Sequence, residues 1–250
     1  MSVEAGVAGA LVTGESPAAA ARRRDHRFFT GMALVALVTI LVGFGPTYYL
    51  GPLFAARPVT PLVHLHALVF TLWSLLFLAQ ASLVAVHRTD IHRRLGVAGG
   101  ALAVIMLVVG YLTAVASARH GVGPPGRNPL AFLAVPLGAL PVFGILVGTA
   151  LWNRRRSETH KRLMLLATIS LLMAAFARMR FIGDGGPPVA MSGTFLLVTV
   201  CWIYDRIAHG RVHPAFLWGG LFVAIMMPVR FAIGTTGPWL AFARWVTGLP

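Results

Sequence analysis

Seven long apolar runs divide this 250-residue sequence, and they restrict its fold more than any other feature. Each run has roughly the 20 residues that an α-helix needs to cross the hydrocarbon of a bilayer. A soluble domain carries about 25% charged residues, whereas this chain carries 11% and is 57% hydrophobic. We therefore expect membrane-spanning helices at residues 29–50, 62–86, 95–117, 130–152, 163–182, 190–208 and 215–236.

The runs are continuously apolar and do not alternate with polar residues, which favours helices over a membrane β-barrel. A helix also satisfies its backbone polar groups within its own segment. The prediction is an all-α, polytopic membrane helix bundle with about seven transmembrane helices. Residues 28–250 form one transmembrane domain, and residues 1–27, which begin with a low-complexity Ala- and Gly-rich segment, form a disordered cytoplasmic tail.

The positive charge of the chain, +14, is spread over short clusters between the apolar runs. A nucleic-acid site would gather these residues on one water-facing surface, so we expect no nucleic-acid partner and a lipid bilayer instead. With a cytoplasmic amino terminus, 14 basic residues flank the spans on the cytoplasmic side and six on the other, which predicts that orientation. The expected location is the bacterial cytoplasmic (inner) membrane. The single cysteine, Cys201, excludes an internal disulfide.

The second span carries a stripe of polar and aromatic side chains at seven-residue intervals: His66, Trp73, Gln80 and His87. This spacing keeps all four on one slowly drifting helix face, about 31 Å long. Such groups bond neighbouring helices in ordinary bundles. They also line solute paths, because polar groups within a membrane are costly. His64 adds a second imidazole at the outer end of the stripe.

Two further histidines begin alternate spans from the cytoplasmic side, His92 in the third and His160 in the fifth. They should lie at equal depth, and they face each other if the two helices are neighbours. Two imidazoles across a helix bundle can act as metal ligands and supply both axial positions of a b-type haem. Asp90 and Glu158 could orient these rings or pair with nearby arginines at the surface.

Arginines accompany the histidines at both ends. Arg93 and Arg94 follow His92 and could meet haem propionates, whereas Arg178 and Arg230 lie near the outer ends of their spans. The outer pair could hold an anionic group beside the outer histidines or extend to the lipid headgroups.

Small residues follow on the His92 face of the third span: Gly96, Gly99 and Gly100. They allow the close approach of another helix, which is their usual role, or of a flat ring.

The placement of His66, His92 and His160 at helix starts resembles the transmembrane di-haem cytochrome b family over residues 62–182. The resemblance implies haem ligation by these histidines and electron transfer across the membrane. The sequence departs from that pattern because no histidine begins the fourth span, so the resemblance extends to an inner haem alone. The stretch from His64 to Gly96 also resembles uncharacterised bacterial multi-span membrane proteins, which implies no activity.

Three functions therefore stay open: a haem-binding electron-transfer protein, a transporter that uses the stripe, and a non-catalytic structural, assembly or regulatory protein. The sequence names neither an electron-transfer partner nor a solute.

Overall fold

The structure is a computed structural model that describes residues 16–54, 59–124, 126–179 and 186–249. Within these residues it is helical without strands, and seven helices are long and apolar enough to cross a membrane. Large apolar side chains cover its outside, including Val97 (77% exposed) and Ile207 (78% exposed). Such a surface is stable only in hydrocarbon. The chain is a multi-pass membrane protein, and the predicted all-α bundle is confirmed.

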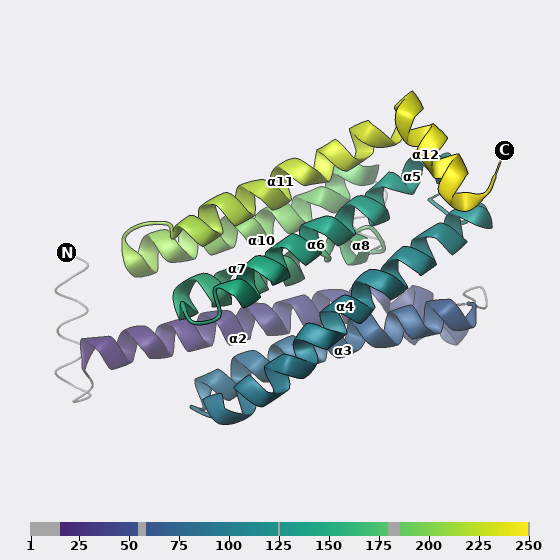
Figure 1. The fold of residues 1–250 in the computed structure, drawn as a ribbon. Coiled ribbons are helices and arrows are strands. Elements are labelled where there is room, and N and C mark those ends of the chain that lie inside the picture. Colours follow the sequence, from purple (N-terminus) through teal and green to yellow (C-terminus); the bar gives the residue numbers. More distant parts are fainter. Residues whose placement is uncertain (1–15, 55–58, 125, 180–185, 250) are drawn as a thin grey trace.

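The helices run side by side and alternate in direction (Figure 1). The elements in chain order are α2 (Pro17–Phe44), η1 (Gly45–Tyr49), η2 (Gly51–Phe54), α3 (Pro61–Ala85), α4 (Thr89–Arg119), α5 (Pro129–Phe132), α6 (Ala134–Trp152), α7 (Ser157–Ser170), α8 (Met173–Phe176), α10 (Gly186–His209), α11 (Pro214–Gly234) and α12 (Gly237–Thr247).

We call the end where α2 begins the inner end, and the opposite end the outer end. The turns α3–α4, α6–α7 and α10–α11 lie at the inner end. Helix α3 packs against α2 and α4, α4 packs against α6, and α11 packs against α6 and α7.

Helix α7 is the central helix, because α2, α6, α10 and α11 all contact it. The fifth span, α7 with α8, has the lowest mean hydropathy of the seven spans, 1.2, yet 67% of its span is buried. The apolar surface of the bundle faces lipid, so polar residues gather on the helix that lipid does not reach. The polar chemistry of the bundle is therefore concentrated around α7.

Helix α2 begins at Pro17, earlier than the sequence indicated, so residues 17–27 of the predicted tail are helical. Residues 1–15 of that tail lie outside the described residues. Ser16 caps this helix by accepting a hydrogen bond from the backbone N–H of Ala19, and Pro17 occupies the first helical position. Both features favour a helix start. The carboxyl-terminal part of the predicted tail, residues 17–27, is thus continuous with the first span.

A short amphipathic helix, α12, crosses the outer end of the bundle (Figure 1). The Trp239 indole N–H donates to the Leu130 carbonyl (2.9 Å), and the Arg119 Nε donates to the Thr247 carbonyl (2.5 Å). Trp245 is 77% exposed on its free face. An exposed indole on an amphipathic helix is typical of the bilayer interface, which marks the level of the outer headgroups.

The orientation can be tested on a background without reactive thiols, because the native Cys201 is fully buried. Cysteine placed at Val122, an exposed outer residue, should react with a membrane-impermeant maleimide on intact cells. Cysteine placed at Arg155, in the inner α6–α7 turn, should react only after lysis. The reverse pattern would contradict the predicted sidedness.

Candidate functional site

Histidines are concentrated at the inner end of the bundle. The chain has nine, and six of them lie on inner ends of helices or in the inner turns: His26, His87, His92, His160, His209 and His213. Four of the seven acidic residues also lie there within helices, at Asp25, Asp90, Glu158 and Asp205. The inner end therefore holds most of the side chains that could bind a metal ion or exchange a proton.

His92 and His160 are brought together, each as the fourth residue of its helix, α4 and α7. Their ring centroids are 6.4 Å apart and their planes are nearly perpendicular, at 84°. The sequence predicted that these two histidines lie at equal depth. In the structure their rings also lie side by side, because the inner ends of α4 and α7 approach each other there.

The hydrogen bonds of His160 fix its tautomer. Its Nδ1 lies 2.8 Å from the Ala150 carbonyl oxygen, which can only accept a hydrogen bond, so Nδ1 carries the proton. In the neutral ring Nε2 then keeps a free lone pair, as a metal ligand requires. The Ala150 carbonyl orients His160, whereas Glu158 pairs with Arg162 (2.6 Å). Asp90 pairs with Arg88 in an exposed contact (3.2 Å). Both carboxylates thus pair with nearby arginines, which is the other role that their positions in the sequence left open.

His92 and Gln80 carry buried polar atoms that lack partners within the described residues, Nδ1 of His92 and Oε1 of Gln80. Gln80 extends from α3 toward α4, where its Nε2 lies 3.6 Å from the place a β-carbon on Gly96 would take. Buried polar atoms are normally satisfied, so such atoms point to a water, an ion or a ligand.

The rest of the second-span stripe divides between interior and surface. Trp73 is buried, and its indole N–H donates to Thr168 Oγ1 on α7 (3.2 Å). His66 stacks on Phe70 (centroids 4.1 Å) and leaves its buried Nδ1 without a partner among the described residues. His87 is exposed at the end of α3 with a positive φ of 61°, so it leaves the stripe.

The predicted outer cluster is only partly assembled. His64 is exposed, and its Nδ1 lies 3.0 Å from the Tyr48 hydroxyl. Arg178 stacks over Phe44, with 4.6 Å from Cζ to the ring centroid, and donates to the Ala174 carbonyl (2.7 Å).

The inner and outer arginines differ in their surroundings. Arg230 is buried between α11 and α6, where it donates to the carbonyls of Met226 (3.1 Å) and Val135 (3.3 Å). These carbonyl contacts give Arg230 a packing role. Arg93 and Arg94 follow His92 in α4 and are exposed, so their contact with haem propionates stays a prediction.

The sequence did not indicate a buried ion pair in the interior, between Arg162 of α7 and Asp205 of α10. Arg162 is 1% exposed and Asp205 is fully buried. Arg162 Nη2 lies 2.6 Å from Asp205 Oδ1, and Arg162 Nε lies 2.9 Å from Asp205 Oδ2. Arg162 Nη1 also contacts Glu158 Oε2 (2.6 Å), and Asp205 accepts a hydrogen bond from the backbone N–H of His213 (2.9 Å). The pair thus ties α7, α10 and the start of α11 together.

A second set of contacts extends the ion pair to α2. Lys161 Nζ lies 2.6 Å from Asp25 Oδ2 and 2.8 Å from Glu158 Oε1. The Tyr204 hydroxyl donates to Asp25 Oδ1 (2.5 Å), and His209 lies 3.2 Å from the same oxygen. Asp25, Glu158 and His209 hold their ligand atoms within 4.8 Å of one another. The Lys161 ammonium already occupies the cation position between the two carboxylates.

Comparisons with known proteins give no match to a family model, to a curated protein or to a solved structure.

Proposed function

We propose that this membrane protein binds a b-type haem whose iron lies between His92 and His160, and that it transfers electrons at the inner face. The observation that carries the proposal is the 6.4 Å separation of the two ring centroids. A bond from metal to imidazole nitrogen is about 2 Å long. Two rings on opposite sides of one metal ion therefore have centroids about 6 Å apart.

The donor set fits iron. His160 presents Nε2 because its Nδ1 is bonded to the Ala150 carbonyl, and a free polar atom of His92 is buried nearby. The flat ring of a haem also needs room along α4. A β-carbon on Gly99 would meet Leu76 Cδ2 at 3.2 Å, and one on Gly100 would meet Leu151 Cδ1 at 3.7 Å. Both contacts are the ends of flexible side chains, so a flat ring would need these two leucines to rotate.

The residues around the pair set its environment. Haem iron supplies the change of oxidation state by which one electron is stored and released. His160 is held in one tautomer, and the exposed Arg93 and Arg94, which follow His92 in α4, would meet the propionates. Burial and nearby charge set a haem potential, and the ion-paired Lys161 is the cation next to His160 in the chain.

Absorption spectra of the purified protein test the proposal. We expect a Soret band that shifts on reduction, with one haem per chain. His92→Ala and His160→Ala should each lower haem occupancy by at least about tenfold, since loss of even an outer-shell partner of a metal site costs that much. His26→Ala is the matched control, because His26 lies at the same end but contacts His87, and it should keep the band.

Metal analysis separates the alternatives. A colourless protein that still holds a transition metal, lost in His92→Ala, would assign the imidazole pair to a bare ion and exclude haem. A colourless and metal-free protein after reconstitution with haem would contradict the proposal. Unchanged unfolding temperatures in the variants would show that the loss reflects ligation and not misfolding.

A further inference from the structure

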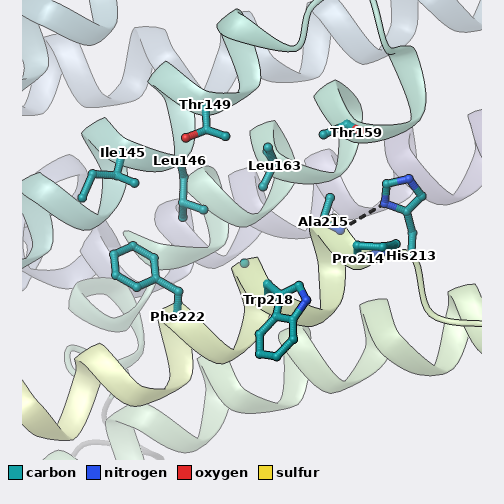
Figure 2. Close-up of a pocket in the computed structure, with 11 residues that line it drawn as sticks. Ile145, Leu146, Thr149, Thr159, Leu163, His213, Pro214, Ala215, Trp218 and Phe222 are labelled. Carbon is teal, nitrogen blue, oxygen red and sulfur yellow. Dashed lines mark hydrogen bonds between the residues drawn. The ribbon is translucent and has the colours of Figure 1, made fainter.

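An apolar groove opens on the outside of the bundle between α6, α7 and α11, in its inner half (Figure 2). Its volume is about 360 Å³, within the range of small-molecule sites. Ile145 and Trp218, at its sides, are 54% and 69% exposed, so the groove faces the hydrocarbon of the inner leaflet. Leu146, Leu163 and Phe222 form much of its wall.

The inner end of the groove is polar. Thr149, Thr159 and His213 line it there (Figure 2). The backbone N–H of Ala215 donates to His213 Nδ1 (3.1 Å), which leaves Nε2 as the donor atom of the neutral ring. Burial and the nearby Arg162 lower the pKa of His213, which keeps this ring neutral.

Cations lie beyond the polar end, in the α6–α7 turn. Trp152 (87% exposed), Asn153, Arg155 and Arg156 line a second cavity of about 270 Å³ there. Both arginines are exposed, and no carboxylate pairs with them in the part of the chain that the structure describes. From Ile145 to Trp152 the helix rises about 10 Å.

We propose that the groove and the α6–α7 turn together form a binding site for one anionic phospholipid of the inner leaflet. The chemistry of the site follows the order of groups along such a lipid. An acyl chain lies against the apolar wall, the ester oxygens lie at Thr149, Thr159 and His213, and the phosphate meets Arg155 and Arg156. Basic pockets between helices on the cytoplasmic side of a membrane are suited to anionic headgroups.

Spin-labelled lipids in vesicles of phosphatidylcholine test the charge requirement. The full-length protein should immobilise labelled phosphatidylglycerol in preference to labelled phosphatidylcholine. Arg155→Gln with Arg156→Gln should reduce this preference by at least about fivefold, because each basic residue near the surface contributes about 1 kcal/mol. Arg22→Gln with Arg27→Gln removes the same charge from the same end, on α2, and should keep most of the preference. Equal losses in both double variants would overturn the proposal.

Filling the groove with a large side chain tests whether a lipid acyl chain lies in it. Thr149→Phe places a ring in the groove from an exposed position, so the fold should be retained. It should remove the preference for labelled phosphatidylglycerol, whereas the lipids that surround the rest of the bundle stay immobilised. Gly148→Phe is the control, because Gly148 has open space around its β-carbon position and does not line the groove. A preference for phosphatidylglycerol that persists in Thr149→Phe overturns the proposal, as does a lipid-free dimer that Thr149→Phe separates, since a second copy would then fill the groove.

Discussion

Asp205→Ala is expected to lower the free energy of unfolding by about 3–5 kcal/mol, the usual cost of removing one partner from a buried ion pair. The carboxylate accepts three hydrogen bonds from two nitrogens of Arg162 and one from the backbone of His213. Without it, the Arg162 cation stays buried and keeps only Glu158, whose side chain is 53% exposed. Reversible unfolding in mixed micelles, followed by circular dichroism, measures the change.

Two further variants serve as controls for this result. Asp90→Ala removes an exposed partner of Arg88, whose side chain is 56% exposed, and should cost less than about 1 kcal/mol. Arg162→Met combined with Asp205→Leu replaces both charges with apolar groups and should recover most of the stability that Asp205→Ala loses. A double variant no more stable than the single one would show that the pair does more than neutralise its own charges.

Gly43→Ala should be among the most damaging of the small substitutions. A β-carbon at Gly43 would lie 2.4 Å from the Ala175 carbonyl oxygen, which is backbone and cannot rotate away. Helices α2 and α8 would have to separate, and overpacking of this kind costs about 1–3 kcal/mol.

Gly31→Ala is the matched control on the same helix, because nothing lies within 4 Å of the β-carbon position. Alanine favours a helix over glycine by up to about 1 kcal/mol, so this variant should be neutral or more stable. Thermal unfolding of the two variants, measured side by side, gives the comparison. If Gly43→Ala melts no lower than Gly31→Ala, the close approach of α2 and α8 is wrong.

Hydropathy and length predicted the seven spans, because the bilayer sets the length of each apolar run. The sequence missed the interruption between α7 and α8, where backbone bonds such as Leu172 N–H to Ile169 carbonyl span three residues. Both sides of that interruption are equally apolar, so composition carries no signal there.

The candidate site could be predicted only as far as depth along the membrane. Equal depth of His92 and His160 followed from their places at helix starts, whereas their contact depends on which helices are neighbours. The Arg162–Asp205 pair was missed because the sequence does not show that α7 and α10 are neighbours. From the sequence alone, Arg162 looks like one of several cations at the level of the lipid headgroups. Asp205 was the available clue, because a carboxylate this close to an apolar run is expensive without a partner.

The central position of α7 has a consequence for how the chain is made. Its inner half brings Arg162 into the membrane region before the ribosome has produced Asp205, 43 residues later. Until then, the guanidinium has only Glu158 from its own helix. We therefore expect the fifth span to enter lipid less readily alone than together with the sixth, whose Asp205 neutralises the Arg162 charge.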